Sequence, residues 1–327
     1  MKVLVTGGAG YVGSHCCKAL AAAGHDVVVY DNLSTGHEWA VKWGPLELGD
    51  ILDGPRLAAV MEQHKPDAVM HFAALAYVGE SVQKPDLYYR TNVGGLVSVL
   101  EAMRDAAIGR IVFSSTCATY GTPETVPITE SEPQSPINPY GHSKLMCEQV
   151  LRDQCAAYGL SAAALRYFNA AGGSPEGEIG ESHDPETHLI PLVLEAAAGI
   201  RPSISILGDD YPTRDGTCVR DYIHVADLAS AHLSALELTG KSAGLFEACN
   251  LGTENGFTVR EIIDAAERIT GRTIPVEIAP RRPGDPPELV ANAAKAREVL
   301  GWRAEVSDVD NVLGTAWRWL TEGKPAA

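Results

Sequence analysis

One continuous stretch, VLVTGGAGYVGSHCCKALAAAGHDVVVYDN at residues 3–32, constrains the fold of this chain more than any other. A short β-branched run ends at Thr6, glycines follow at positions 7, 10 and 13, and apolar residues then recur at helical spacing. A second β-branched run at 26–30 leads directly to Asp31. A strand, a tight turn, a helix and a second strand in this order predict a right-handed βαβ unit of a parallel sheet.

Each glycine of this turn has a physical task in holding a dinucleotide. Gly7, Gly10 and Gly13 would allow a tight turn, close approach of the backbone to a pyrophosphate, and close packing of the helix on the strand. The N-terminus of the helix would stabilise the anion, and Gly8 with Gly10 and Gly13 also satisfies GxGxxG. Asp31 is placed to accept hydrogen bonds from adenosine ribose hydroxyls and would repel a 2′-phosphate. The turn therefore favours NAD over NADP.

Two later segments are weaker candidates for the same cofactor site. Asp50, in LGD at 48–50, is expected near the adenine, although it could instead cap a helix that begins near Asp53. The backbone of HFAALA at 71–76 is expected to pass the pyrophosphate and the ribose.

Strand-like runs alternate with helical patterns through the first half of the chain, which predicts an α/β doubly wound (Rossmann) parallel sheet covered by helices on both faces. After about residue 170 the sequence becomes rich in Gly, Pro and acidic residues and predicts a loop that leaves the sheet. We predict an NAD-binding domain at 1–170, with return segments around 218–252, and a second, smaller α/β substrate domain at 171–327. The predicted strands are KVLVT at 2–6, DVVVY at 26–30, AVMHF at 68–72, RIVFSS at 110–115 and SAAALRYFN at 161–169.

The segment NPYGHSKLMCEQ at 138–149 places Tyr140 four residues before Lys144. A helix beginning near Tyr140 would put both side chains on one face, so the ammonium can lie near the phenol and a nicotinamide ribose. Positive charge from Lys144 and oxidised nicotinamide would pull the phenol pKa below its usual value of about 10, and Tyr140 could then act as a base. Thr116, at the carboxyl end of a central strand, could relay a proton. Alternatively, Ser114, Ser115 and Thr116 could merely satisfy a loop backbone.

Composition argues against several other classes of function. A formal net charge of -16 without a run of Lys or Arg predicts no nucleic-acid partner. Seven cysteines without a CxxC pair suggest reduced, buried thiols, and we expect neither a zinc site nor disulfides, and no metal. No apolar stretch approaches the roughly 18 residues needed to span a bilayer, and strand-like sequence from Lys2 leaves no room for a signal peptide. We therefore expect a cytoplasmic protein with no membrane partner.

The motifs TGGAGYVG, SSTCATYG and YGHSK resemble the extended short-chain dehydrogenase/reductase family. Within that family, GHDVVVYDNLSTGH, HFAALAYVGESVQKPDLYYRTNV, LRYFNAAG, DYPTRDGTCVRDYIHVADLA, NLGT and RRPGDPPELVAN are similar to the UDP-glucose 4-epimerase pattern, as far as about residue 292. The resemblance implies an NAD-dependent isomerase of galactose metabolism that interconverts UDP-glucose and UDP-galactose through a transient 4-keto sugar. It also implies that the smaller domain binds the UDP-sugar, with inward-facing arginines on the diphosphate.

The same resemblance implies which residues surround the ligands. Three residues would be catalytic: Tyr140, Lys144 and Thr116. The cofactor would contact Gly7, Gly10, Tyr11, Val12, Gly13, Asp31, Asn32, Asp50, Ile51, Phe72, Ala73, Ala74, Tyr140, Lys144 and Tyr167. The substrate would contact Thr116, Asn169, His188, Leu189, Ile204, Leu207, Arg220, Arg282, Asp285 and Leu289.

Some positions depart from the family pattern. Thr116 stands where many members carry Ser and keeps the hydroxyl, whereas His188 stands where Asn is often found. Ala76 and Leu289 occupy positions at which some members have longer or bulkier residues beside the sugar. A UDP-N-acetylhexosamine or UDP-pentose 4-epimerase therefore stays an alternative.

A sugar-nucleotide 4,6-dehydratase shares the fold and the Tyr-Lys pair, but it needs an acid and a base directly after Thr116. Cys117 and Ala118 occupy those positions here and cannot transfer the required protons. A non-catalytic NAD-binding regulator would have no need for Tyr140, Lys144 and Thr116 together.

The resemblance further suggests a homodimer that pairs helices around 86–105 and 140–158. Their apolar positions fit either a core or a dimer seam, and the periodicity alone leaves both open. These positions are Leu96, Val99, Leu100, Leu145, Val150 and Leu151.

Overall fold

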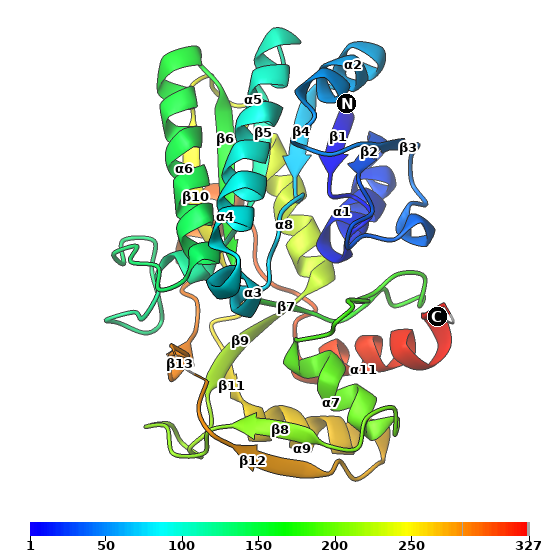
Figure 1. The fold of residues 1–327 in the computed structure, drawn as a ribbon, viewed down its shortest axis with the longest axis vertical. Helices are drawn as coiled ribbons and strands as arrows, with labels where there is room; N and C mark the ends of the chain where they lie inside the picture. Colours follow the sequence, from blue (N-terminus) through cyan, green and yellow to red (C-terminus); the bar gives the residue numbers. More distant parts are fainter. Residues whose placement is uncertain (283, 326–327) are drawn as a thin grey trace.

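A seven-stranded parallel sheet forms the larger unit of this computed structural model, which describes residues 1–282 and 284–325 (Figure 1). Every neighbouring pair of strands in it runs parallel, as the alternation of strands and helices predicts. In spatial order the strands are β10 (Phe246–Leu251), β6 (Ser161–Tyr167), β5 (Arg110–Thr116), β4 (Ala68–His71), β1 (Lys2–Thr6), β2 (Asp26–Asp31) and β3 (Leu46–Leu48).

Helices cover both faces of this sheet, because successive side chains of a strand point to opposite sides. In β1, Leu4 belongs to the apolar cluster on one face, and Val3 and Val5 belong to the cluster on the other. The first face packs against α2 (Gly54–His64), α5 (Gly95–Asp105) and α6 (Pro139–Tyr158). The second packs against α1 (Tyr11–Ala22), α8 (Val225–Leu238) and α10 (Ala294–Leu300). The doubly wound α/β prediction is confirmed.

A smaller unit lies below the sheet in Figure 1 and has its own apolar core. Its strands are β7 (Asn169–Ala171), β9 (Val219–His224), β11 (Gly256–Thr258) and β13 (Glu288–Leu289), together with the parallel pair β8 (Ile204–Leu207) and β12 (Val276–Ala279). Its helices are α7 (Leu189–Ala197), α9 (Val259–Thr270) and α11 (Val309–Arg318). Short helical turns complete the described chain: η1 (Glu38–Ala40), η3 (Cys117–Thr119) and η4 (Trp319–Gly323).

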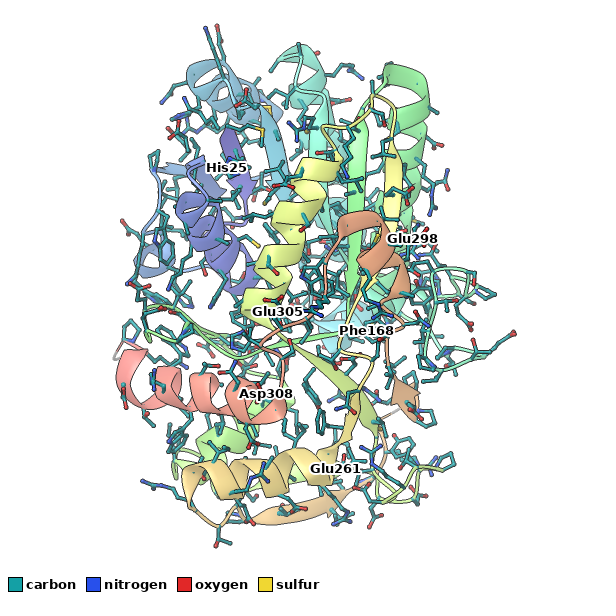
Figure 2. The ribbon with its side chains drawn as sticks, turned by 180° about the vertical axis from the view of Figure 1, so that it is seen from behind. His25, Phe168, Glu261, Glu298, Glu305 and Asp308 are labelled. Carbon is teal, nitrogen blue, oxygen red and sulfur yellow. The ribbon has the colours of Figure 1, made fainter. Side chains whose placement is uncertain are left out.

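Only part of the predicted return segment, residues 218–252, lies on the large sheet. α8 packs on the sheet and β10 pairs with β6, whereas β9 pairs with β7, β11 and β13 in the smaller unit. The strand expected at 161–169 is also interrupted at Phe168, which joins β6 to β7 at the junction of the two units (Figure 2). Pro283, within the RRPGD motif, and residues 326–327, at the end of the predicted smaller domain, lie outside the described residues.

The helix expected around 86–105 is divided into α4 (Pro85–Tyr88), the π-helical segment η2 (Tyr89–Gly94) and α5. Within η2, the buried Asn92 side chain donates to Ser143 Oγ on α6 and to Leu75 O, at 2.9 and 3.0 Å. Asn92 Oδ1 also accepts from Leu75 N. The widened turn thus ties α6 to the chain that follows β4, where α3 (Val78–Gln83) soon begins. None of the helices within the described ranges is both long enough and apolar enough to cross a membrane.

Candidate active site

A cavity of about 500 Å³ runs from the carboxyl ends of the central strands to the smaller unit. Its lining includes the first turn of α1, the ends of β2, β5 and β6, the start of α6, and residues of β9 and β13. Open α/β sheets bind ligands at the carboxyl ends of their strands, so this is the expected place for a site.

The glycine turn forms one end of the cavity. Gly7 has a φ of +74°, and a Cβ there would lie 2.5 Å from Ala73 N. A Cβ on Gly13 would collide with the carbonyl oxygen of Gly7, whereas one on Gly10 would meet only that oxygen, at 3.3 Å. Gly10 precedes α1 without a side-chain cap, and no acidic residue lies in the first turn. The backbone N–H groups of the helix terminus therefore border the cavity, which fits the pyrophosphate of NAD.

Asp31 and Asp50 lie at the adenine end of this turn, and both line the cavity. Asp31 accepts hydrogen bonds from Ala9 N and Leu33 N, at 3.0 and 2.8 Å, through different oxygens. Because each carboxylate oxygen has a second lone pair, both can still accept from ribose hydroxyls. Asp50 accepts from the Asn32 side-chain amide at 2.9 Å. Asp53, not Asp50, caps α2 by accepting from its backbone, so the alternative reading of Asp50 as that cap is wrong.

The remaining cofactor candidates also line the cavity. They are Tyr11, Val12, Asn32, Ile51, Phe72, Ala73, Ala74 and Tyr167. Tyr11 donates to Gly172 O at 2.6 Å, and Tyr167 shares a 2.5 Å hydrogen bond with Ser114 Oγ. The first of these bonds joins the glycine turn to the start of the loop that leaves the sheet.

Tyr140, Lys144 and Thr116 all line the cavity. Asn138 caps α6 by accepting from Gly141 N at 2.8 Å, and Pro139 occupies the first turn, so the helix begins where the motif requires. Lys144 is buried, and its Nζ donates to Ser114 O at 2.8 Å and lies 4.8 Å from the Phe113 ring centre. This single acceptor leaves two of the three ammonium protons for a ligand.

Burial controls the charge states of this trio. It lowers the pKa of Lys144 to about 8 and raises the pKa of Tyr140 to about 12, although the Thr116 hydroxyl opposes the second shift. The expected fall of the phenol pKa depends on Lys144 together with bound oxidised nicotinamide, and among the protein's own groups burial has the larger effect. The positive charge of oxidised nicotinamide is the remaining source of a downward shift.

The hydroxyls of Ser115 and Thr116, at the end of β5, each form a hydrogen bond within the protein. Ser115 Oγ donates to Glu148 at 2.6 Å, and Thr116 Oγ1 accepts from Ala118 N at 3.1 Å. Thr116 was interpreted either as a proton relay or as a partner of the loop backbone. The two interpretations are compatible, because its hydroxyl caps the following turn and the residue also lines the cavity.

The opposite end of the cavity carries most of the predicted substrate residues. Those that line it are Asn169, His188, Leu189, Arg220, Arg282, Asp285 and Leu289. Arg220 pairs with Asp285 at 2.5 Å, so part of its charge is already neutralised. Arg281, next to Arg282, instead pairs with Asp210 at 2.6 Å and lies over the Tyr211 ring.

Ile204 and Leu207 are placed elsewhere. Both lie on β8 and neither is part of the cavity lining. Ile204 is buried in the core of the smaller unit, where it packs with α7 and α9, and Leu207 pairs in register with Ala279 of β12. Direct contact of either side chain with the substrate is not supported.

The lining also includes residues that were not predicted from the sequence, among them Tyr77, Glu181 and His183. Burial alone would raise the pKa of Glu181 and lower that of His183, but the Glu-His contacts bring them to about 2 and about 10. The spacing ExHxxExH at 181–188 could have indicated Glu181 and His183 from the sequence. His188, predicted as a substrate contact, bonds to Glu181 at 2.5 Å through Nδ1.

Comparison with known proteins agrees with this geometry. A family model described as the NAD dependent epimerase/dehydratase family matches residues 3–252. The chain is 54% identical over 318 residues to a UDP-glucose 4-epimerase of Rhizobium meliloti (strain 1021), covering 97% of this chain and 96% of that relative.

Two solved structures show the same fold. The crystal structure of UDP-glucose 4-epimerase from Brucella ovis in complex with NAD superposes with a TM-score of 0.94 at 55% identity, over 97% of both chains. That of the Bifidobacterium longum enzyme in complex with NAD+ and UDP has a TM-score of 0.94 at 39% identity, over 98% of both chains. On the combined evidence of motifs, fold and cavity, the chain belongs to the NAD dependent epimerase/dehydratase family.

Proposed function

We propose that this chain catalyses NAD-dependent epimerisation at C4 of a UDP-hexose and interconverts UDP-glucose and UDP-galactose. The observation that carries the proposal is one cavity that joins the glycine turn, the Tyr140-Lys144-Thr116 trio and Arg220, in a chain 54% identical to a UDP-glucose 4-epimerase. The seven-stranded unit then holds NAD, and the smaller unit holds the uridine diphosphate.

The trio divides the proton chemistry in the following way. Tyr140 removes the proton of the sugar 4-hydroxyl, and Thr116 lies beside it to relay that proton. Lys144 uses its free ammonium protons to orient the cofactor ribose. When bound, NAD supplies the reversible acceptance of the hydride that leaves C4 of the sugar. A 4-keto sugar therefore forms and is reduced on its other face, without net oxidation.

The diphosphate needs a firm anchor because the hexose must turn within the cavity. Arg220 and Arg282 supply planar donors that suit phosphate oxygens in a chain of net charge -16. Asn169, Leu189 and Asp285 line the same end and are proposed contacts of the nucleotide.

Two rival functions are less well supported. A 4,6-dehydratase needs proton-transfer groups after Thr116, but burial raises the pKa of Cys117 to about 12 and Ala118 has no proton to give. A UDP-N-acetylhexosamine 4-epimerase depends on the space beside Leu289, which is partly buried against Cys117, Tyr120 and Phe168.

The proposal predicts that purified protein converts UDP-galactose to UDP-glucose without added NAD. A coupled assay for UDP-glucose measures this, and a parallel reaction contains UDP-N-acetylgalactosamine. Conversion of the first substrate alone supports a hexose epimerase, and conversion of both shows that Leu289 leaves room for the acetyl group. If neither substrate reacts even after NAD is supplied, the substrate assignment is wrong.

We further propose that the chain forms a homodimer through α5 and α6. Leu96, Val99, Leu100 and Leu151 are buried in the core, so they are not available for a seam. The other two predicted seam residues, Leu145 and Val150, are only partly buried. Met146 and Val97 on the same helices are 47% and 37% exposed and are among the apolar positions open to a partner.

Light scattering is expected to give about twice the chain mass of 34.7 kDa. Met146→Asp should shift the protein toward monomer, because a charge in an apolar seam loses its hydration. Val276→Asp, at an equally exposed apolar position on β12, should leave the mass unchanged. A wild-type monomer would refute the dimer.

A further inference from the structure

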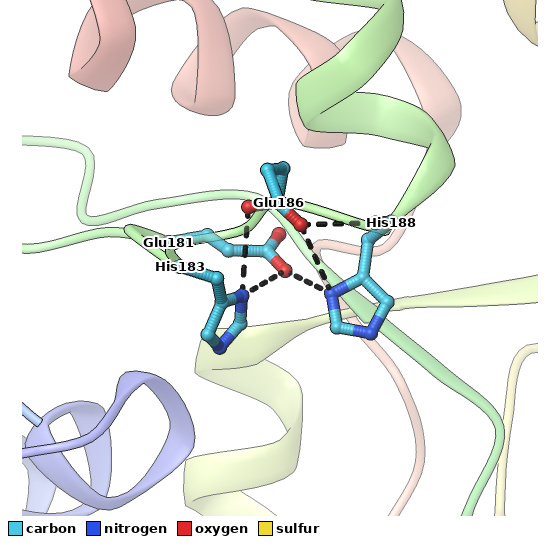
Figure 3. Close-up of side chains that lie close together, drawn as sticks. All are labelled: Glu181, His183, Glu186 and His188. Atoms are coloured by element: carbon cyan, nitrogen blue, oxygen red, sulfur yellow. Dashed lines mark hydrogen bonds and ion pairs between the residues drawn. The ribbon is translucent and has the colours of Figure 1, made fainter. Parts of the chain in front are cut away.

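Four side chains in the loop between β7 and α7 form a compact group that has no role in the proposed proton transfer, although His188 among them is a predicted substrate contact. They are Glu181, His183, Glu186 and His188, hereafter the His/Glu cluster (Figure 3). Each offers one ligand atom, and these atoms all lie within 4.8 Å of one another. The set combines two imidazoles with two carboxylates.

The distances within the His/Glu cluster approach those of a tetrahedral metal site. His183 Nδ1 lies 3.2 Å from Glu181 Oε1 and 3.5 Å from Glu186 Oε2, and His188 Nδ1 lies 3.5 Å from Glu186 Oε1. Zinc bonds of about 2.0 to 2.1 Å in a tetrahedron place neighbouring ligands about 3.3 Å apart. The contact of 2.5 Å between His188 Nδ1 and Glu181 Oε1 needs to widen by less than about 1 Å to match, and the two remaining ligand pairs lie within 4.8 Å.

The carboxylates are buried and already oriented. The side chains of Glu181 and Glu186 are only 6% and 8% exposed. Glu186 Oε1 accepts from Thr187 N and His188 N at 2.7 and 2.9 Å, and Trp319 donates to Glu181 O at 2.8 Å. The two backbone donors hold the Glu186 carboxylate in one orientation, as outer contacts do for metal ligands, and the Trp319 bond fixes the backbone carbonyl of Glu181.

His183 provides an independent indication of a ligand. Its Nδ1 is buried and has no hydrogen-bond partner within the described part of the chain, although it faces both carboxylates of the cluster. Buried polar atoms are normally hydrogen-bonded, so a nitrogen that lies between two carboxylates without a well-directed hydrogen bond to either fits a metal ion placed among them. The ring is held edge-on by Tyr11 and Tyr77, with ring centres 6.3 and 6.0 Å away.

We propose that the His/Glu cluster binds one divalent transition-metal ion of the zinc type and thereby fixes the loop between β7 and α7. Two imidazoles favour zinc over magnesium or calcium, which prefer oxygen ligands, and four protein ligands are typical of a structural rather than a catalytic site. The proposal departs from the sequence expectation of no metal, which considered only the cysteines. The proposal does not depend on the epimerase assignment.

The direct test uses the full-length protein after treatment with a chelator. Equilibrium dialysis against Zn²⁺ with elemental analysis is expected to give one ion per chain. His183→Asn and His188→Asn should each weaken binding by about 100-fold or more, because each removes a ligand outright. His64→Asn is the matched control, since His64 also contacts a glutamate, Glu47 at 2.6 Å, but lies outside the cluster.

Two further measurements keep the test decisive if a histidine variant fails to fold. Wild-type protein loaded with Co²⁺ should show the visible bands of tetrahedral nitrogen and oxygen ligands, whereas thiolate charge-transfer bands would assign the ion to a cysteine. Zn²⁺ should also slow proteolysis within residues 172–188. The proposal is overturned by binding well below one ion per chain, by equal binding in all variants, or by thiolate bands. The cluster would then be a set of ion pairs between protonated imidazoles and carboxylates.

Discussion

Replacing Tyr140 with Phe is expected to lower the turnover of UDP-galactose by about 100- to 10,000-fold, the usual contribution of a positioned acid-base group. The phenol is the proposed base at the 4-hydroxyl, and Thr116 beside it cannot replace it, because an aliphatic hydroxyl is a far weaker acid. The phenyl ring keeps its packing, so bound NAD should change little. The measurement is kcat by the coupled assay, with NAD content determined on the same sample.

Tyr158→Phe provides the control for this experiment. Tyr158 is the last residue of α6, the helix that carries Tyr140, and it is 61% exposed. The same loss of a phenol oxygen there should leave kcat and NAD content unchanged. A Tyr140→Phe variant that keeps more than about one-tenth of wild-type kcat would remove Tyr140 from the proposed role.

The larger unit could be predicted because its signals are local. Strand β1 matches the expected range, and β2, β4 and β5 differ from it by one residue at one end. Buried parallel strands are short, continuous apolar runs between turn residues, and such runs are visible without knowledge of the fold. The glycine turn is equally local, since Gly7 requires a positive φ and Gly13 has no room for a side chain.

The smaller unit was less predictable because its pairing is not local. The residues around 218–252 were expected to return to the large sheet, but nothing in CVRDYIH indicates that β9 pairs with β7, β11 and β13 instead. Ile204 has the apolar character of a pocket residue, but alternation along β8 turns it into the core. The division of the helix around 86–105 depends on hydrogen bonds of Asn92 to distant residues, which local sequence does not reveal.

Local sequence also predicted the candidate site only in part. The Tyr140 and Lys144 spacing predicted their shared face correctly, but the direction of the Tyr140 pKa shift depends on burial, which spacing does not report. Glu181 and His183 were not predicted because their segment has the composition of a polar loop, and only the folded chain brings His183 against Tyr11 and Tyr77.

The second large effect is expected from Glu148, which lies four residues beyond Lys144 on the same face of α6. Its buried carboxylate accepts from Arg166 Nε at 2.8 Å and from Ser115 Oγ at 2.6 Å. Arg166 is buried too, and its NH1 donates to Tyr120 at 2.7 Å. This network joins the helix that carries Tyr140 to the strand that carries Thr116.

Glu148→Gln should lower the free energy of unfolding by about 3 to 5 kcal/mol, because it leaves the Arg166 charge buried without a counter-charge. Urea unfolding monitored by circular dichroism measures this loss. Arg152→Met is the matched control: Arg152 contacts the same carboxylate at 3.6 Å from a position 38% exposed, so its loss should cost about 1 kcal/mol or less.

The double variant Glu148→Met with Arg166→Met separates stability from positioning. Replacing a buried ion pair with apolar side chains of similar volume is often neutral or stabilising, so the double variant should be more stable than Glu148→Gln, although Ser115 and Tyr120 lose partners. Its kcat should nevertheless fall, because Ser115 no longer fixes the end of β5 against α6, and small displacements of reacting groups slow catalysis strongly. A double variant with normal kcat would limit the pair to a structural role. A double variant less stable than Glu148→Gln would show that replacing both charges with apolar side chains costs more than leaving Arg166 without a counter-charge, contrary to the desolvation argument.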